Sequence, residues 1–317
     1  MISGKKILIC GATGFLGSNI LESFSKLPVL IRATYHDRKP SFQNLENVEW
    51  VRADLTNSQD VKKVMSEIDI VFQYAAVTSG AKDIVNSPHM HVTDNAVMNS
   101  LLLREAYEQQ IDHFVFPSCT IMYQTSDTPV KESDFDESVD IHPRYYGAGN
   151  TKTYLEKMCK FYSSKGDTKF TVLRQSNVYG PRDKFNLDTG HVFAATVVKV
   201  DQSESEVRVW GTGEEERDLI HVSDLVKLLH TVVENQNSQF ELLNVGAGSS
   251  VSISSLVKKI ILSSGKDLSI VYDKDKPTIK TKLAVDISKA RELFGWEPAV
   301  SLDEGIDQTL EWYGRNK

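Results

Sequence analysis

A glycine-rich segment near the N-terminus has the residue types and spacing to bind a dinucleotide. Gly11, Gly14 and Gly17 stand in GATGFLG, which directly follows the apolar stretch KILIC and directly precedes an amphipathic segment. Glycines at this spacing allow a tight turn, close approach to a pyrophosphate and close helix–sheet packing, while the N-terminus of the following helix attracts the phosphates. The predicted cofactor-binding loop comprises Gly11, Thr13, Gly14, Phe15, Leu16 and Gly17.

The end of the second strand is expected to choose between NAD and NADP. In dinucleotide-binding units an acidic residue about 20 positions after the glycines holds the ribose hydroxyls of NAD. Here that place falls at Tyr35, and His36, Asp37 and Arg38 follow it. Without an acid at the expected place, and with His36 and Arg38 beside it, the sequence favours a 2′-phosphate and predicts NADP(H). NAD(H) stays open, because Asp37 could take the acidic role if the strand shifted by two residues.

Two short segments are expected to complete the cofactor site. Asp54 and Leu55, in the turn ADL, are candidates for contacts to the adenine. Ala75 and Ala76 would keep the wall beside the pyrophosphate thin. The alternative for all four is an ordinary turn or core residue.

The elements that must position these residues alternate between strand and helix. Short β-branched runs that are apolar on both faces, taking turns with helical segments, are typical of a parallel sheet covered on both sides. We predict an α/β, Rossmann-like, doubly wound parallel sheet over residues 1–180. A smaller α/β domain over 181–317, mainly for substrate binding, is expected to form a cleft at the carboxyl ends of the strands, and some of its segments could return to the first domain. The predicted strands are 6–10, 31–36, 48–53, 68–76, 113–118, 170–176, an isolated strand at 207–211, and 240–246; the predicted helices are 59–67, 92–110, 151–164, one with Ser223 as N-cap, 253–263, 286–294 and 302–314.

Composition excludes several classes of protein. With 36 Lys and Arg against 43 Asp and Glu, the net charge of −7 disfavours a dedicated nucleic-acid binder. No apolar run approaches the ~20 residues that cross a bilayer, and the N-terminus does not resemble a signal peptide, so we expect a cytoplasmic protein without membrane contact. The 3 cysteines are too few and too scattered for a disulfide framework or a zinc site, so no metal is predicted.

Taken together, motifs along nearly the whole chain resemble the extended short-chain dehydrogenase/reductases, also called the NAD-dependent epimerase/dehydratase family. They are GATGFLG, ADL, VFQYAA, HFVFPSCTIMY, the Tyr-Gly/Lys segment, VLRQSNVYGP, VRVWGTGEEERDLIHVSDL and DISKARELFGWEP. Within the family, the chain is most similar to nucleotide-sugar 4-keto reductases and epimerases, the group that includes GDP-L-fucose synthase. The spacing from NVYGPRDKF to His191, and the places of Trp210 and Arg217, carry that likeness.

The resemblance implies a tyrosine–lysine pair, but the pair is altered here. Hydride transfer to a sugar carbon needs a proton at the sugar oxygen, which a tyrosine can supply when a cation lowers its pKa. The family places its tyrosine four residues before its lysine. Lys152 matches that lysine, which also holds the nicotinamide ribose, yet Ala148 stands four residues before it. The nearest tyrosines are Tyr146 and Tyr145.

The backbone between the tyrosines and Lys152 was therefore expected to be irregular. Six residues of continuous helix would separate Tyr146 from Lys152 by about 240° and 9 Å, too far to meet one ligand. Gly147, Ala148, Gly149 and Asn150 argue against a continuous helix. We predict a two-residue insertion after Gly147, a helix beginning near Asn150, and Tyr146 folded back towards Lys152. Tyr146 is the first candidate for the acid/base and Tyr145 the second; neither is the third possibility.

The segment PSCTIMY is expected to supply the hydroxyl that bonds the sugar oxygen. Where the family has Ser or Thr, this chain has Cys119, a weak donor, so Thr120 is preferred and Ser118 comes second. Cys119 itself could be a small buried hydrophobe. No acid follows the hydroxyl, so dehydration is not expected. His191 matches a histidine that related enzymes use to epimerise the sugar, although it could instead bond substrate or backbone without proton transfer.

The remaining predictions concern the substrate and partners. The resemblance implies a nucleotide-diphosphate sugar and a homodimer in which the helices near 92–110 and 151–164 form a four-helix bundle. The main hypothesis is NADP(H)-dependent reduction at C4 of such a sugar. The alternatives are a 4-epimerase with tightly bound NAD and a non-catalytic dinucleotide sensor or scaffold. Candidate substrate contacts are Asn177, His191, Trp210, Arg217 and Lys282.

Overall fold

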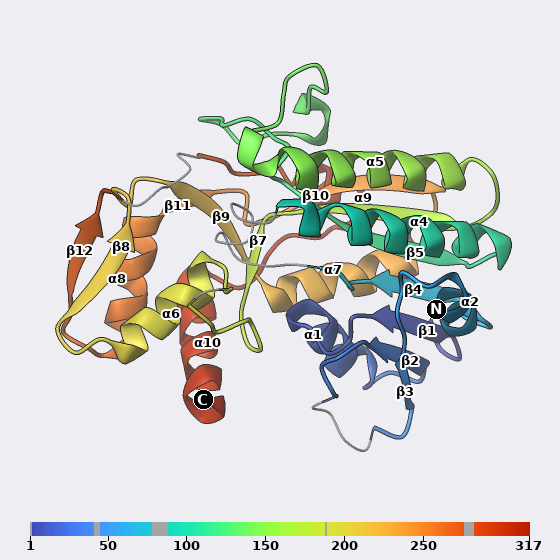
Figure 1. Cartoon of the computed structure of the whole chain (residues 1–317), viewed down its shortest axis with the longest axis horizontal. Coiled ribbons are helices and arrows are strands. Elements are labelled where there is room, and N and C mark those ends of the chain that lie inside the picture. The colour runs from blue at the N-terminus through green and yellow to red at the C-terminus, as the bar shows by residue number, and fades with distance from the viewer. Residues whose placement is uncertain (1, 41–44, 78–87, 188, 276–281) are drawn as a thin grey trace.

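A seven-stranded parallel sheet forms the larger part of the protein (Figure 1). The computed structural model describes residues 2–40, 45–77, 88–187, 189–275 and 282–317. The strand order is β10-β6-β5-β4-β1-β2-β3, so the chain adds strands to one side of β1 first and then, from β4 onwards, to its other side. The carboxyl ends of the strands at such a switch point are where ligands of doubly wound sheets bind. The strands are β1 (Lys6–Cys10), β2 (Leu30–Tyr35), β3 (Val48–Arg52), β4 (Ile70–Gln73), β5 (His113–Cys119), β6 (Lys169–Gln175) and β10 (Phe240–Val245). The predicted doubly wound α/β fold is confirmed.

Helices cover both faces of this sheet because its strands are apolar on both. Ile7 and Ile9 of β1 belong to one hydrophobic core, and Leu8 and Cys10 belong to the other. The first core is closed by α1 (Phe15–Phe24), α7 (Val222–Asn235) and α9 (Ser288–Phe294). The second is closed by α2 (Ser58–Met65), α4 (Thr93–Glu108) and α5 (Tyr146–Ser163), and Figure 1 shows α4 and α5 lying side by side.

The second half of the chain builds a smaller body beside the sheet and also returns to the sheet. β7 (Asn177–Tyr179), β9 (Glu216–His221) and β11 (Ser250–Ser252) form a three-stranded sheet, and β8 (Glu206–Trp210) pairs in parallel with β12 (Ser269–Asp273). Their core is shared with α6 (Val192–Gln202), α8 (Ile253–Ser264) and α10 (Leu302–Asn316). In contrast, β10, α7 and α9 belong to the large sheet and its cover, and the boundary near residue 180 stays a prediction.

Two local predictions in this half were wrong. The strand expected to be isolated at 207–211 pairs with β12, a distant segment that its own sequence could not reveal. Ser223 is not the N-cap of α7; that position is His221, whose side chain accepts a hydrogen bond from the Ser223 amide.

None of the helices in the described ranges is long and apolar enough to cross a membrane.

The predicted start of α5 near Asn150 was also wrong. The helix begins at Tyr146, and the Asn150 side chain donates to the Tyr146 carbonyl rather than capping the helix. The glycines serve close packing instead of a break. A Cβ on Gly149 would lie 2.9 Å from Ile141 Cδ1, and one on Gly147 would lie 2.8 Å from Val92 Cγ2.

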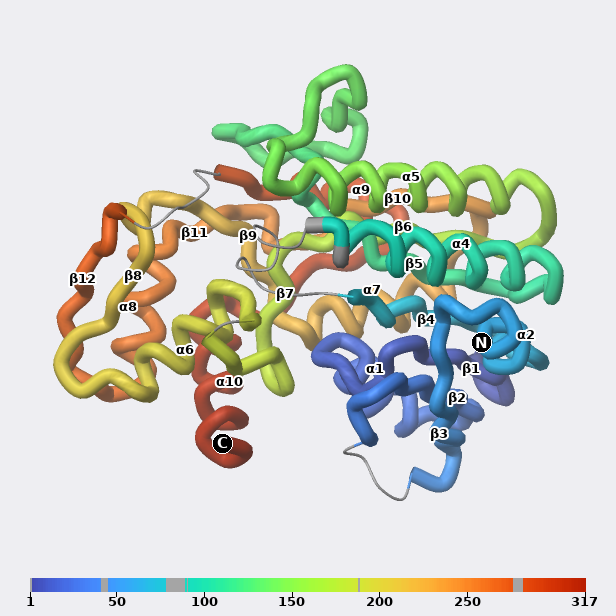
Figure 2. The backbone as a smooth tube through the Cα atoms, viewed as in Figure 1, coloured from blue at the N-terminus to red at the C-terminus, as the bar shows by residue number. Residues whose placement is uncertain are grey.

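Before α5 the chain makes a long excursion from the end of β5. Figure 2 shows this segment, in green, rising beyond α5 before it turns back into that helix. It contains two short 3₁₀ turns, η2 (Glu132–Asp134) and η3 (Pro143–Tyr145). Val130 pairs with Val285 in a parallel bridge, which ties the excursion to the segment before α9. A third 3₁₀ turn, η1 (Pro88–His91), precedes α4.

Candidate functional site

The glycine loop is folded as a dinucleotide phosphate site requires. Gly11 has φ of 69°, and a Cβ there would lie 2.7 Å from the Ala75 backbone. A Cβ on Gly17 would lie 2.2 Å from the Gly11 carbonyl oxygen, so this position also excludes any side chain. Gly14 is the N-cap of α1, where unpaired backbone amides of the first turn gather.

The surroundings of Gly14 fit a pyrophosphate. Among the described residues, only the Gly11 carbonyl oxygen lies within 4 Å of a Cβ built on Gly14. A side chain there would otherwise project into open space at the helix N-terminus, the space that an incoming phosphate needs. The opposite wall is held by Gln73, whose amide donates to the Ala75 carbonyl and accepts from the Ala75 amide. Ala76 is exposed next to it.

Basic side chains gather at the end of β2. His36 and Arg38 are exposed there, and Arg52 of β3 donates to the His36 carbonyl at 3.1 Å. The Asp37 carboxylate lies 3.1 Å from His36 Nδ1 and 3.7 Å from Arg52 Nη2. Asp37 thus faces two basic groups. Arg52 is a member of this group that the sequence analysis did not single out.

The ADL turn is shaped by its own side chains. Asp54 accepts hydrogen bonds from the amide and hydroxyl of Thr56, at 2.9 and 2.6 Å. These hydrogen bonds hold the pKa of Asp54 below its ordinary value. Leu55 is buried in the core under α2, so it supports the turn from below. The predicted contact to adenine stays a prediction.

Lys152 points from α5 to the carboxyl end of β5. Its ammonium donates to the Pro117 carbonyl at 2.6 Å and lies 4.6 Å from the centroid of the Phe116 ring. Burial lowers the pKa of Lys152, and the nearby Cys119 and Glu156 act in the opposite direction. Burial also raises the pKa of the Cys119 thiol, against the influence of Lys152. Lys152 and Cys119 are therefore neighbours.

Ser118, the second candidate for the sugar hydroxyl, is engaged elsewhere. Its hydroxyl donates to Glu156, which lies on α5 one turn after Lys152. Glu156 also receives Arg174 Nη2 at 2.7 Å, and both side chains of this pair are almost fully buried. Arg174 in turn donates to the Tyr123 hydroxyl at 2.9 Å. Ser118 thus belongs to a buried network that fastens α5 to β5 and β6.

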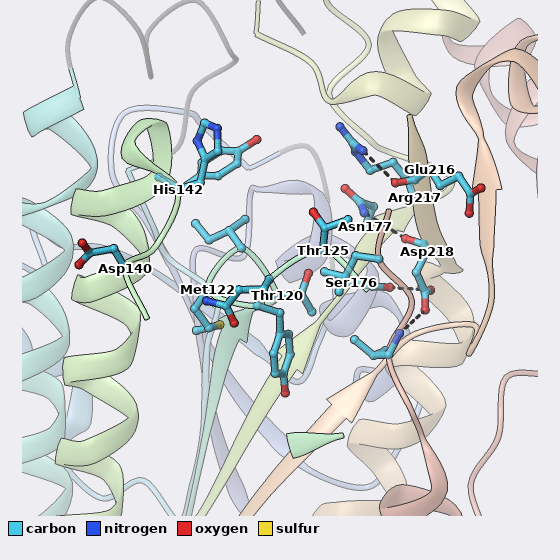
Figure 3. A pocket seen from close by; sticks show the side chains of 16 residues that line it. Thr120, Met122, Thr125, Asp140, His142, Ser176, Asn177, Glu216, Arg217 and Asp218 are labelled. Carbon is cyan, nitrogen blue, oxygen red and sulfur yellow. Dashed lines mark hydrogen bonds between the residues drawn. The ribbon is translucent and has the colours of Figure 1, made fainter. Parts of the chain in front are cut away.

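A cavity of about 330 Å³ lies beyond the carboxyl ends of β5 and β6 (Figure 3). It brings together four predicted site residues: Thr120, Tyr145, Asn177 and Arg217. Figure 3 shows His142 on the wall opposite Asn177, Arg217 and Asp218, with Thr120 between them. The cavity is lined by Thr120, Ile121, Met122, Tyr123, Gln124, Thr125, Asp140, His142, Tyr145, Ser176, Asn177, Glu216, Arg217, Asp218, Leu283 and Val285.

The two adjacent tyrosines at the start of α5 have different surroundings. Tyr145, the last residue of η3, is half-buried and lines the cavity. Tyr146, the first residue of α5, is 55% exposed and is not among the residues that line the cavity. Because α5 is continuous, Tyr146 does not fold back towards Lys152 as predicted.

Hydrogen bonds to Asp218 organise the far wall of the cavity. Asp218 is buried and accepts hydrogen bonds from the Ser176 hydroxyl and from the amides of Ala247, Gly248 and Val285, at 2.7 to 3.2 Å. Burial raises its pKa and these hydrogen bonds oppose the rise. The side-chain amide of Asn177 donates to the Asp218 carbonyl at 3.0 Å. Sequence analysis missed Asp218, although its place directly after Arg217 in the quoted motif was a signal.

Arg217 is the cation of this wall. Its guanidinium donates to the Glu216 carbonyl at 2.8 Å. Burial lowers its pKa, while the Tyr145 phenol and the Glu215 carboxylate act in the opposite direction. Tyr145 and Arg217 both line the cavity.

Three predicted substrate contacts are not among the residues that line the cavity. Lys282 forms an ion pair with Asp127 at 3.1 Å. Trp210, at the end of β8, is 49% exposed, and the Lys199 ammonium lies 5.6 Å from its ring centroid. His191 is the exposed N-cap of α6. The structure does not bring these three side chains together with Tyr145, and their roles stay predictions.

Comparison with known proteins identifies the family of this chain. Residues 7–246 match the NAD dependent epimerase/dehydratase family. The chain is 28% identical to dTDP-4-dehydro-6-deoxy-D-allose reductase of a Streptomyces species, over 99% of this chain and 98% of the relative. It is also 28% identical to GDP-L-fucose synthase 1 of Arabidopsis thaliana, over 98% and 94%.

A solved structure shows the same fold over the whole chain. UDP-glucose 4-epimerase of Thermotoga maritima, determined with UDP-glucose, has a TM-score of 0.87 at 26% sequence identity, covering 98% of this chain and 99% of that one. Both a 4-keto reductase and a 4-epimerase are thus similar along the full length. The family members that are similar to this chain are nucleotide-sugar reductases, epimerases and dehydratases. The chain belongs to the NAD dependent epimerase/dehydratase family.

Proposed function

We propose that this enzyme reduces the C4 ketone of a nucleotide-diphosphate sugar, with NADP(H) as cofactor. One observation carries the proposal: a single cavity is lined by both a phenol, Tyr145, and a guanidinium, Arg217. The cofactor, held at the glycine loop and by Lys152, supplies the hydride. Tyr145 supplies the proton to the sugar oxygen, and the hydroxyl of Thr120, which is 7% exposed, bonds that oxygen.

In the family pattern, one lysine both holds the nicotinamide ribose and supplies the cation near the tyrosine. In this protein we assign the first role to Lys152 and the second to Arg217. Lys152 is fixed at the end of β5 and serves as the clamp for the nicotinamide ribose. Arg217 is the cation that stabilises negative charge on Tyr145 and helps to bind the diphosphate, with Asn177 beside it. This division follows from Ala148, which stands where the family tyrosine would be, and from the continuous helix α5.

The decisive experiment follows absorbance at 340 nm with NADPH and a set of dTDP- and GDP-linked 4-keto-6-deoxy sugars, and reads product stereochemistry by NMR. We expect net NADPH consumption. Tyr145→Phe should lower kcat by about 10²- to 10⁴-fold, whereas Tyr146→Phe, at an exposed position outside the cavity, should stay within about twofold of wild type. Full activity in Tyr145→Phe would remove the proposed proton donor.

The same assay distinguishes the two alternatives. A 4-epimerase would copurify with NAD and convert nucleotide sugars without net consumption of cofactor; the likeness to UDP-glucose 4-epimerase is the observation in its favour. A non-catalytic sensor would bind the dinucleotide and turn over none of the sugars; Ala148 at the family tyrosine position is the feature in its favour.

The preference for NADP(H) rests on the basic groups at the end of β2. His36 and Arg38 are exposed just after β2, where the sequence predicts the ribose 2′ substituent, and Asp37 lies close to both His36 and Arg52. We expect kcat/KM to be higher with NADPH than with NADH. Arg38→Ala should lower kcat/KM for NADPH about tenfold and leave the value for NADH unchanged. A preference for NADH that Arg38→Ala does not alter would contradict this assignment.

We further propose a homodimer through α4 and α5. Val97 and Tyr107 of α4, and Tyr154 and Phe161 of α5, are 40–48% exposed, which is unusual for large apolar side chains. A second copy packed on this face would bury them in a four-helix bundle. Sedimentation at micromolar concentration should give a dimer, and Phe161→Glu with Tyr154→Glu should give a monomer. A wild-type protein that sediments only as a monomer would exclude this assembly.

A further inference from the structure

The 3₁₀ turn that carries Tyr145 presents a second ring to the cavity. A 3₁₀ helix has three residues per turn, so residues three apart lie on the same side. His142, the N-cap of η3, is three residues before Tyr145, and the two ring centroids lie 6.0 Å apart. Both side chains line the cavity. One turn of backbone therefore places an imidazole beside the proposed proton donor.

The Nδ1 atom of His142 holds the imidazole ring to the backbone of the turn. Nδ1 accepts a hydrogen bond from the Arg144 amide at 3.3 Å. A ring nitrogen that accepts a hydrogen bond carries no hydrogen, so the neutral ring has its hydrogen on Nε2. Figure 3 shows this ring on the wall that faces Arg217 and Asn177. A neutral ring with this hydrogen bond therefore carries Nε2–H, and its side chain, although exposed, lines the cavity.

The segment at the end of β5 offers few hydroxyl groups that could hydrogen-bond the reacting oxygen of the sugar. Cys119 offers only a thiol, and the Ser118 hydroxyl is directed to Glu156. Two residues of this segment with hydroxyl groups line the cavity, Thr120 and Tyr123, and the Tyr123 hydroxyl is already hydrogen-bonded to Asn244 and Arg174. Thr120 is therefore the candidate from this segment. A carbonyl oxygen accepts two hydrogen bonds, which Tyr145 and Thr120 can fill. The alkoxide that forms during reduction accepts three.

We propose that His142 is a further catalytic residue, whose Nε2–H donates a hydrogen bond to the sugar oxygen as negative charge develops on it. The inference rests on the proposed reduction. As C4 accepts a hydride with its electron pair, the C=O π electrons move onto the oxygen, and that oxygen takes the Tyr145 proton. Tyr145 regains a proton from water. His142 transfers no proton, because Nδ1 stays bonded to the Arg144 amide, and so it acts only by stabilising the charge.

Two substitutions separate this role from simple capping. His142→Asn keeps a side-chain oxygen able to cap η3, because Asn is a favoured N-cap, but its amide is too short to reach the position of Nε2. His142→Ala removes both the cap and the donor. We expect both variants to lower kcat about 10²-fold with NADPH and the GDP- or dTDP-linked 4-keto sugar that wild type reduces. KM and NADPH affinity, measured by fluorescence quenching, should change less than threefold, and the melting temperature of His142→Asn should match that of wild type.

A second measurement reads the ring without relying on turnover. In protein labelled with ¹⁵N-histidine, with the resonance assigned from its loss in His142→Asn, the spectrum of free protein should show the neutral Nε2–H tautomer. Adding the nucleotide-linked 4-keto sugar with NADP⁺ should shift the Nε2 resonance. A protonated Nδ1 in the free protein, or an Nε2 resonance that ignores the sugar, would overturn the proposal.

The kinetic outcomes are also decisive. Wild-type kcat in His142→Asn together with reduced kcat in His142→Ala would show that the side chain only caps the turn, and wild-type kcat in both would show that it does neither. These results would remove His142 and leave the proposed reduction standing. A wild-type protein that reduces none of the sugars would overturn the proposed function, and the role of His142 with it.

Discussion

Among the ion pairs of the described residues, the pair between Glu156 and Arg174 is the most deeply buried, so we expect it to be the most sensitive to substitution. The carboxylate receives Arg174 Nε at 3.1 and 3.2 Å and Nη2 at 2.7 Å, and also the Ser118 hydroxyl. The two side chains are 4% and 6% exposed. Glu156→Ala would leave the guanidinium buried without its carboxylate, which costs about 3–5 kcal/mol of unfolding free energy. With an unfolding entropy of about 2.1 cal/mol/K per residue over 317 residues, the melting temperature should fall by about 4.5–7.5 °C.

The assay is urea or thermal unfolding at pH 7, with an exposed ion pair as the matched control. Glu297 lies 3.2 Å from Arg291, and both side chains are more than half exposed, so Glu297→Ala should cost less than about 1 kcal/mol. Replacing both members of the buried pair by Leu should recover part of the loss, because no uncompensated charge remains. Equal unfolding free energies for Glu156→Ala and Glu297→Ala would refute the reasoning.

Further predictions concern the glycine loop and two buried aspartates. Gly17→Ala, whose Cβ would lie 2.2 Å from a carbonyl oxygen, should weaken NADPH binding more than about tenfold in a fluorescence titration, whereas Gly314→Ala, with no described atom within 4 Å of its Cβ, should bind like wild type. Burial raises the pKa of Asp183 to about 7. Between about pH 4 and pH 7, the folded protein therefore keeps a proton on Asp183 that the unfolded protein has lost. Because of this difference, the free energy of unfolding should fall as the pH rises through this window. Asp183→Asn should therefore be more stable than wild type by about 1–3 kcal/mol at pH 8 and nearly equal at pH 4; a gain that is the same at both pH values would argue against this origin. Asp218→Asn should instead lose about 2–4 kcal/mol and raise KM for the sugar, because an amide nitrogen cannot accept from the donors that surround the carboxylate; unchanged unfolding and KM would show that these hydrogen bonds are dispensable.

Much of the fold could be predicted because its signals are local. GATGFLG needs only its own glycines and the flanking strand and helix to form the phosphate turn, and the structure shows why Gly11 and Gly17 tolerate no Cβ. The central strands of the large sheet, β1, β4, β5 and β6, are buried on both faces, so their apolar runs stand out in the sequence.

The helix start before Lys152 could not be predicted in the same way. Gly147 and Gly149 have two physical uses, a break in a helix or a close contact, and sequence alone does not tell them apart. Here the space that side chains would need is occupied by Val92, which lies 55 residues before Gly147, and by Ile141, which lies eight residues before Gly149 in the irregular segment that precedes α5. That contact, rather than propensity, lets α5 run on to Tyr146 and turns this phenol towards solvent.

By itself, the sequence determined the glycine turn, the parallel sheet and the set of residues able to move a proton, because each depends on neighbours a few positions away. Only the tertiary structure decided which of those residues share a cavity. Tyr145 and Arg217 come from segments more than 70 residues apart and meet through the excursion before α5 and strand β9, while Ser118 is drawn into the Arg174 network and Lys282 pairs with Asp127. The physical reason is that a side chain's partner is fixed by the packing of whole elements, which no local pattern encodes.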